Sequence, residues 1–331
     1  MDVGSTTVKI VVMDEDLKEI YTSYERHYSD TKNTVCKVLE ELVEKYKDKE
    51  FTIALTGSGA MSTAKFLDVP FIQEVVACKR SVERYIPQTN VVIELGGEDA
   101  KIIYFGRSVE QRMNGTCAGG TGAFLDQMAS LLHTDTQGLN ELAKTYKTIY
   151  PIASRCGVFA KTDVQPLLNE GAAKEDIAVS ILQAVVNQTI SGLACGRPIR
   201  GNVAFLGGPL TYLPELRKRF VETLHLTPEQ TIVPEEAHLL VAKGACLEAK
   251  DESPISVEKL KSKNAAACQS LTLSEFTFIP RNGLSTLIKA SSVDFYRYLK
   301  EDIELEAYAS YFMEFVLRNE EENQPDLDVF N

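Results

Sequence analysis

The sequence has no long uninterrupted apolar run. Ile10–Met13 and Val91–Ile93 are representative of its apolar runs, and both are far shorter than the roughly 20 residues that a membrane-spanning helix needs. The first residues, MDVGSTTVK, contain no basic region followed by an apolar stretch, which is the pattern of a secretory signal peptide. We therefore expect a cytoplasmic protein with no membrane partner.

Basic residues are also in short supply. Lysine and arginine total 35 against 47 aspartates and glutamates, so the 331 residues carry a net charge of −12. Without a basic cluster there is no electrostatic footprint for a nucleic-acid backbone, and no nucleic-acid partner is expected. Part of the acidity is local, since residues 301–331 contain ten acidic side chains and one basic one. That end of the chain is a region of distinct composition.

Several common functional motifs are absent. The seven cysteines include no Cys-x-x-Cys pair and the four histidines stand alone, which excludes a zinc site of the usual spacing. No GxxxxGK[ST] segment occurs, which excludes a Walker A loop, and no convincing dinucleotide-binding glycine fingerprint is present.

What is present is an alternation of strands and helices. Short β-branched or apolar runs predict strands over 8–13, 20–26, 51–56, 91–95, 100–105 and 203–206. Apolar positions at helical spacing predict helices over 75–85, 123–132, 163–168, 174–193, 213–224 and 237–248. Thr31 or Asn33 would cap a further helix, and residues 152–159 are expected to be irregular or extended. The alternation indicates an α/β protein.

The same device occurs twice: a strand, a turn of small or polar residues, and a returning strand. This repetition suggests two related halves. After Lys250 the pattern weakens, so residues 251–331 are predicted to be a poorly defined acidic extension.

Three loops at strand ends have the composition of a phosphate-binding site. They read Asp2-Val3-Gly4-Ser5-Thr6-Thr7, Glu94-Leu95-Gly96-Gly97-Glu98-Asp99 and Leu206-Gly207-Gly208-Pro209. Small residues let backbone N–H groups approach an oxyanion closely, and a carboxylate such as that of Asp2 suits Mg²⁺ through water. Each loop alone is more typical of a tight hairpin turn, but the three in this order, each at a strand end, are much more specific.

Two cysteines lie in unusual surroundings. Cys117 is within Asn114-Gly115-Thr116-Cys117-Ala118-Gly119-Gly120, and Cys156 is within Ser154-Arg155-Cys156-Gly157. Backbone donors near small residues stabilise thiolates and anionic clusters, although a free cysteine is more often a buried, inert side chain. Two thiolates cannot complete a four-thiolate iron–sulfur site, but two copies of the chain across a two-fold axis could.

The segments DVGSTT, TGSG, ELGGEDAK, NGTCAGGTG, SRCGVFAKTD, LGGP and VAKGA, in this order, resemble the ATPase family that activates 2-hydroxyacyl-CoA dehydratases and benzoyl-CoA reductases. The resemblance covers about residues 2–250. Within that family the chain looks similar to the N-terminal module of the long proteins in which the activator module occurs twice.

The resemblance implies an actin-like, sugar-kinase-like ATPase fold with two RNase-H-like lobes around a nucleotide cleft. Residues 1–86 with a closing helix over 237–250 would form the first lobe, and residues 87–236 the second. The implied ATP and Mg²⁺ site takes Asp2, Gly4, Ser5, Thr6, Thr7 and Lys9 from the first phosphate loop, Gly96, Gly97, Glu98, Asp99 and Lys101 from the second, and Gly207 and Gly208 at the adenosine. Glu98 or Asp99 would orient the attacking water, with Glu74 a weaker candidate.

The resemblance also implies that Cys117 and Cys156 bind a 4Fe–4S cluster shared between two subunits. The pair would be a homodimer, or a pseudo-dimer with a second activator module. ATP hydrolysis would drive an electron from a ferredoxin or flavodoxin donor into a 2-hydroxyacyl-CoA dehydratase or a related reductase. Two alternatives stay open: a small-molecule (sugar) kinase of the same fold, which leaves the cysteines without a role, and an inactive fragment of a longer activase.

Overall fold

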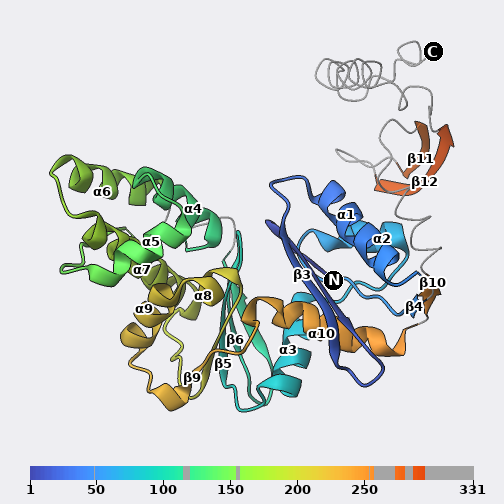
Figure 1. The fold of residues 1–331 in the computed structure, drawn as a ribbon, viewed down its shortest axis with the longest axis horizontal. Helices are drawn as coiled ribbons and strands as arrows, with labels where there is room; N and C mark the ends of the chain where they lie inside the picture. The colour runs from blue at the N-terminus through green and yellow to red at the C-terminus, as the bar shows by residue number, and fades with distance from the viewer. Residues whose placement is uncertain are drawn as a thin grey trace, which may run out of the picture. The chain divides into compact units, whose positions relative to one another are not determined.

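Two larger β-sheets organise the computed structural model, which describes residues 1–47, 49–114, 120–153, 157–252, 254–256, 273–279 and 286–294. The chain divides into two units, Met1–Asn264 and Ala265–Asn331. Both larger sheets lie in the first unit (Figure 1).

The first sheet is antiparallel, with strand order β1-β2-β3. It contains β1 (Asp2–Val3), β2 (Thr7–Met13) and β3 (Glu19–Arg26). Helices α1 (Thr31–Lys45) and α2 (Ala60–Leu67) bury apolar side chains against β2, among them Val38, Leu39 and Ala64. The predicted strands over 8–13 and 20–26 are confirmed to within a residue.

The predicted strand over 51–56 is only partly formed. Strand β4 (Glu50–Phe51) is short, and it pairs with β10 (Ile255–Ser256). Beyond it, single bridges join Thr56 to Asp2 and Leu55 to Phe71. Because β1 has only two residues, it offers the 52–56 segment a single parallel bridge.

The second sheet has five strands in the order β7-β6-β5-β8-β9. Its central strand β5 (Val91–Leu95) pairs antiparallel with β6 (Ala100–Tyr104) and parallel with β8 (Val203–Leu206). Strands β7 (Glu110–Met113) and β9 (Thr231–Ile232) form the edges. Every residue of β5, β6 and β8 is buried, as expected of a sheet covered on both faces.

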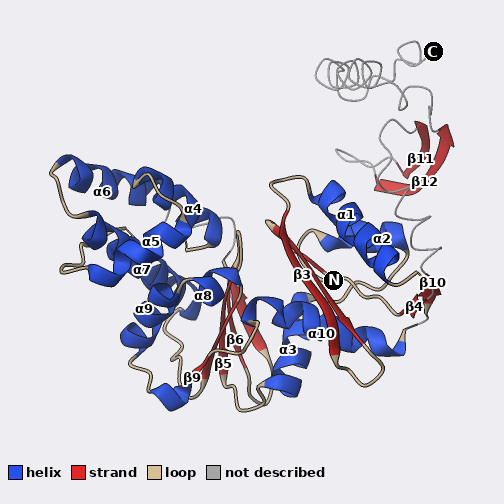
Figure 2. Cartoon of the chain, viewed as in Figure 1, coloured by secondary structure: helices blue, strands red, loops and turns tan. Residues whose placement is uncertain are grey.

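Helices cover both faces of this sheet (Figure 2). Val91, Ile93 and Leu95 point to one face, where they pack against a large helical cluster. Its helices are α4 (Gly122–Leu131), α5 (Thr136–Leu142), α6 (Gly157–Asn169), α7 (Lys174–Thr189), α8 (Gly208–Tyr212) and α9 (Pro214–Leu224).

The opposite face carries α3 (Glu74–Tyr85) and α10 (Leu240–Glu248), which pack on Val92 and Ile103. Helix α10 is preceded by the short helix η4 (Ala237–Leu239) and reaches the first sheet through Ala242, which contacts Val11. These two helices therefore lie between the two sheets and join them.

Two local predictions were wrong. Helix α1 is capped by Asp30, whose side chain accepts from the backbone N–H of Asn33, and not by Thr31 or Asn33. Residues 157–159 are the first turn of α6 and not an extended segment. A carboxylate is as good an N-cap as a hydroxyl, and Asp30 lies one residue before Thr31, the first of the two predicted caps.

One helical stretch in the described residues, Lys174–Ala194, is long and apolar enough to cross a membrane by composition. It comprises α7 and the π-helical turn η2 (Ile190–Ala194), and 67% of its most apolar window is buried inside the protein. The core helix of a globular lobe has these properties. In the second unit, β11 (Leu273–Ile279) pairs antiparallel with β12 (Thr286–Asp294).

Candidate active site

The first two phosphate-loop candidates are turns of the same geometry. In the first, Asp2 pairs with Lys9 across the hairpin and Gly4 N–H donates to Thr7 O at 2.9 Å. In the second, the pairing is Glu94 with Lys101, and Gly96 N–H donates to Asp99 O at 2.7 Å. Residues 2–9 and 94–101 therefore correspond position by position in their pairing, each placing an acid opposite a lysine. We call residues 4–7 the first loop and residues 96–99 the second loop.

In both loops, backbone carbonyl groups accept hydrogen bonds from main-chain amides of a neighbouring segment. In the second loop, Gly96 O and Gly97 O accept from the first amides of α4, those of Gly122 and Ala123, at 3.0 and 2.8 Å. In the first loop, Thr6 O accepts from the backbone N–H of His27 at 3.1 Å.

The loop amides, by contrast, are available. Within the described part of the chain, the N–H groups of Ser5, Thr6, Gly97 and Glu98 donate to no protein group. Such a row of amides around a turn is a nest for an anion.

The two loops face each other at close range. A Cβ added to Gly97 would collide with the side chain of Thr6. Glycine at position 97 is therefore required by the contact between the loops. An anion bound by one loop would lie within reach of the other.

A buried charge cluster lies beside the loops. Lys9 Nζ donates to Asp2 Oδ2 at 2.7 Å, and Asp2 is 4% exposed. Lys101 Nζ, also buried, donates to Glu74 and lies 4.0 Å from Glu94 and 3.8 Å from Asp99. The lysines expected to meet phosphates thus meet carboxylates in the protein itself.

The environment shifts the pKa values of this cluster. Burial alone would lower the pKa of Lys9 and Lys101, but the surrounding carboxylates outweigh it and raise both. Burial raises the pKa of Glu74, and Glu94 and Asp2 add to that effect against the opposing pull of Lys101. The four carboxylates and two ammonium groups leave two negative charges at the floor of the site when all are ionised.

Glu98 and Asp99 differ in their surroundings. Asp99 is partly buried and belongs to the Lys101 cluster, whereas Glu98 is exposed and has no ion pair among the described residues. Glu98 is therefore the less constrained of the two carboxylates, and the water-orienting role stays a prediction for both.

The third loop opens a helix. Gly207 has φ +88°, and a Cβ there would collide with the backbone of Leu95. Gly208 begins α8, and a Cβ there would lie 2.7 Å from the hydroxyl of Tyr24. Glycine at position 207 is therefore required by close backbone approach, whereas Gly208 approaches only the end of a side chain.

A cavity of about 290 Å³ adjoins this third loop. Gly208 and Tyr212 line it from α8, Gln137 from α5, and Tyr24 and Arg26 from β3. Gly122 also lines it, so the cavity is continuous with the helix start that holds the second loop.

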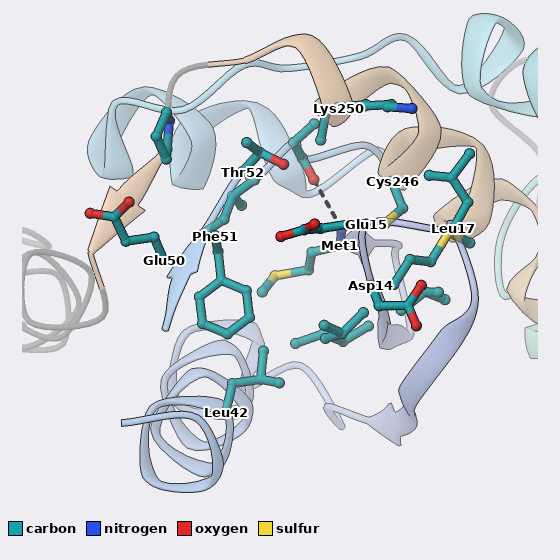
Figure 3. A pocket seen from close by; sticks show the side chains of 18 of the residues that line it. Met1, Asp14, Glu15, Leu17, Leu42, Glu50, Phe51, Thr52, Cys246 and Lys250 are labelled. Carbon is teal, nitrogen blue, oxygen red and sulfur yellow. Dashed lines mark hydrogen bonds between the residues drawn. The ribbon is translucent and has the colours of Figure 1, made fainter. Parts of the chain in front are cut away.

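A second cavity of about 380 Å³ lies beside Met1, and none of the residues of the three loops lines it (Figure 3). Its walls include Ile10, Leu39 and Phe51, and the Met1 ammonium at its edge donates to Ala54 O at 2.9 Å. Its lining includes none of the loop residues described above, so it has no part in the candidate site.

Cys117 and Cys156 both lie outside the described residues, so their predicted metal-binding role stays a prediction. Among the described residues, no three His, Cys, Asp or Glu side chains are grouped to hold a metal ion.

Comparison with known proteins agrees with this geometry. A family model described as "BadF/BadG/BcrA/BcrD ATPase family" matches residues 1–249. The chain belongs to this ATPase family. The expected extent of the resemblance, residues 2–250, is thereby confirmed.

A relative from Clostridioides difficile, the 2-hydroxyisocaproyl-CoA dehydratase activator, is 32% identical over 271 residues, 79% of this chain and 97% of its own length. The solved structure of a Clostridium difficile activator of the same dehydratase, with bound ADPNP, gives a TM-score of 0.65 at 27% identity, and covers 80% of this chain and 96% of that one. The predicted α/β, actin-like ATPase fold is confirmed.

A match of a different kind is DNA repair protein RecO from Listeria monocytogenes, 38% identical over 69 residues. It covers only 21% of this chain and 27% of that protein. It is too short to show a family, and it says nothing about the site.

Sequence reasoning missed the residues contributed by β3 and its following turn. Tyr24, Arg26 and His27 come from a strand whose sequence carries no glycine or acidic motif. Their role depends on the fold, which brings the end of β3 beside the first loop. The residues of the charge cluster, by contrast, all stand in or beside the motifs read from the sequence, with Glu74 the weakest candidate among them.

Proposed function

We propose that this protein is an ATP-dependent reductive activator, which uses MgATP hydrolysis to drive a low-potential electron into an acyl-CoA dehydratase or related reductase. The observation that carries the nucleotide part is the pair of matching loops, which lie against each other and carry unpartnered amides. Membership in the ATPase family and similarity to a dehydratase activator support the rest.

The loops and the adjoining cavity suit the parts of ATP. The β- and γ-phosphates would lie between the first and second loops, on the amides of Ser5, Thr6, Gly97 and Glu98. The base and ribose would occupy the 290 Å³ cavity beside Gly207 and Gly208, a size at the lower end of small-molecule sites.

Mg²⁺ would be held beside the charge cluster mainly by water and phosphate oxygens, because no three described side chains are grouped to bind it directly. Hard carboxylate oxygens are the ligands that Mg²⁺ prefers, and the two surplus negative charges match its charge. Asp2 would hold it through water, and Mg²⁺ would neutralise charge on the transferred phosphoryl group. Glu98 would orient the attacking water, while Lys101 holds Asp99, Glu94 and Glu74 in place.

The electron-transfer part rests on Cys117 and Cys156. Four thiolates, two from each of two copies, would bind one 4Fe–4S cluster, which would supply the low-potential electron. A ferredoxin or flavodoxin would reduce it, and the dehydratase would dock on the dimer. These steps take place in the cytoplasm in our proposal.

The proposal is tested on full-length protein reconstituted anaerobically with iron and sulfide. We expect about four iron and four acid-labile sulfide per dimer, lost in Cys117→Ala, together with ATP hydrolysis that needs Mg²⁺. Asp2→Asn should abolish hydrolysis and leave the iron content unchanged. Iron-free protein whose ADP production requires a sugar would replace the proposal with the kinase alternative. Folded protein that neither binds ATP nor holds iron would identify an inactive fragment.

A further inference from the structure

His27 follows directly on strand β3 and lies under the first loop. It is buried, with 5% exposed. Its backbone N–H donates to Thr6 O at 3.1 Å, and its ring Nε2 lies 3.2 Å from Gly4 O. One residue therefore contacts two of the carbonyl groups of this loop.

The hydrogen bonds of the ring fix its tautomer. The backbone N–H of Ser29 donates to Nδ1 at 3.2 Å, and Thr31 Oγ1 lies 3.3 Å from the same atom. An amide N–H can only donate, so Nδ1 is an acceptor and the ring proton resides on Nε2. The Nε2–H group therefore donates to Gly4 O.

The turn after His27 is strained. Tyr28 and Ser29 have φ values of +46° and +70°, a left-handed conformation that non-glycine residues avoid. The strain does not serve to bury Tyr28, which is 83% exposed. The turn is held by Ser29 N–H on Nδ1 and by Asp30 N–H on His27 O at 2.7 Å. Backbone strain of this kind concentrates at functional sites.

The second loop shows what His27 replaces. There, two consecutive amides at the start of α4 hold the carbonyls of Gly96 and Gly97. At the first loop, helix α2 begins beside Val3, since the N–H of its N-cap Gly59 donates to Val3 O at 2.9 Å. The carbonyl of Gly4, the counterpart of Gly96, is bonded instead by the ring of His27, and the main chain of His27 bonds Thr6 O. Because a trans peptide places its C=O and N–H on opposite sides, a Gly4 carbonyl turned toward His27 turns the Ser5 N–H away from it.

We propose that His27 is a positioning residue of the first phosphate loop, keeping its amides directed at the phosphates of ATP. This inference rests on the proposed nucleotide site. It assigns His27 no contact with the nucleotide, so its effect must pass through the Gly4–Ser5 peptide.

Two substitutions separate the contribution of Nε2, which bonds Gly4, from that of Nδ1, which bonds Ser29. His27→Gln places an amide N–H near the position of Nε2 and keeps the bond to Gly4, whereas His27→Asn places an acceptor near Nδ1 and keeps only the bond from Ser29. We expect Kd and KM for ATP to rise about tenfold or more in His27→Asn, with kcat within about threefold of wild type. In His27→Gln all three should stay within about threefold. Adenosine, which has no phosphates, should bind all variants equally.

Ser81→Ala is the matched control, because Ser81 is also buried and its hydroxyl donates to a backbone carbonyl, that of Cys78, in helix α3. It should lower thermal stability without changing ATP affinity. If His27→Asn does not fold, His27→Phe is measured instead. Phenylalanine keeps an aromatic ring at this position but forms none of the hydrogen bonds of the imidazole, and the same criteria apply.

Wild-type affinity for ATP in His27→Asn, or equal losses for ATP and adenosine, would overturn the positioning role. Failure of the wild-type protein to bind ATP would instead overturn the proposed function itself.

Discussion

At the scale of single residues, Lys101 has the most demanding environment in the site. It is buried against three carboxylates, those of Glu74, Glu94 and Asp99. Taking charged groups out of water is expensive, and their mutual attraction repays the cost only when every group has a partner. Lys101 thus holds together a cluster that would otherwise repel itself.

We predict that Lys101→Met lowers the free energy of unfolding by about 3 kcal/mol or more, because it leaves buried carboxylates without their cation. Urea denaturation measures this directly. The control is Lys79→Met: Lys79 pairs with Glu83, both side chains are about half exposed, and exposed pairs contribute roughly 0–1 kcal/mol. Equal stability losses in the two variants would show that burial of the Lys101 cluster has no energetic consequence.

At the scale of elements, the contact between α3 and α10 joins the two sheets. Gly244 of α10 lies against the backbone of Ala77 in α3, so closely that a Cβ would collide with the Ala77 carbonyl. The close approach of the two backbones depends on the absence of one side chain. It also sets where Glu74, at the start of α3, meets Lys101 on β6.

Gly244→Ala should therefore destabilise the protein by about 1–3 kcal/mol through overpacking. Gly192→Ala is the control, since the nearest atom to a Cβ at Gly192 is a Gln188 side-chain nitrogen at 3.5 Å, an ordinary contact. There alanine should be neutral or slightly stabilising, because it restricts the unfolded chain. Denaturation curves for both variants test the difference, and a neutral Gly244→Ala would mean that the helices can separate without cost.

At the scale of the whole molecule, one exposed ion pair links β3 to α4 beside the 290 Å³ cavity. Arg26, at the end of β3, donates to Asp126 of α4 at 3.0 Å, and both side chains are nearly half exposed. Such a pair contributes little to stability. It joins the two sides of the 290 Å³ cavity, however, because Arg26 and α4 both line that cavity.

We predict that Asp126→Asn speeds the release of a fluorescent ADP analogue by about threefold or more and changes the unfolding free energy by less than about 1 kcal/mol. Stopped-flow dissociation measures the first effect. The exchange Arg26→Asp with Asp126→Arg should restore slow release. Unchanged release rates in all variants would show that this ion pair does not influence release of the nucleotide.

Much of the fold follows from local patterns. The strand at 203–206 is an uninterrupted apolar run, and the strand at 91–95 is apolar apart from Glu94. The helices at 74–85 and 214–224 have clear helical periodicity. The strand over 51–56 was predicted less well, because its pairing depends on β1, which supplies only two residues. The cap of α1 was misplaced because Asp30, Thr31 and Asn33 are all acceptable cap residues at that position.

The sequence by itself determined the α/β class, the three small-residue loops, and the family that their order indicates. These are local properties, since a turn needs small residues wherever it occurs. Only the tertiary structure decided which groups meet: that Lys9 and Lys101 pair with carboxylates, that Thr6 touches Gly97, and that His27 supports the first loop. The Lys9–Asp2 pair lies within one hairpin, 7 positions apart, but the contacts of His27 with Gly4 and of Lys101 with Glu74 join residues 23 and 27 positions apart. Such distances in space are set by how the sheets and helices pack, which no local pattern records.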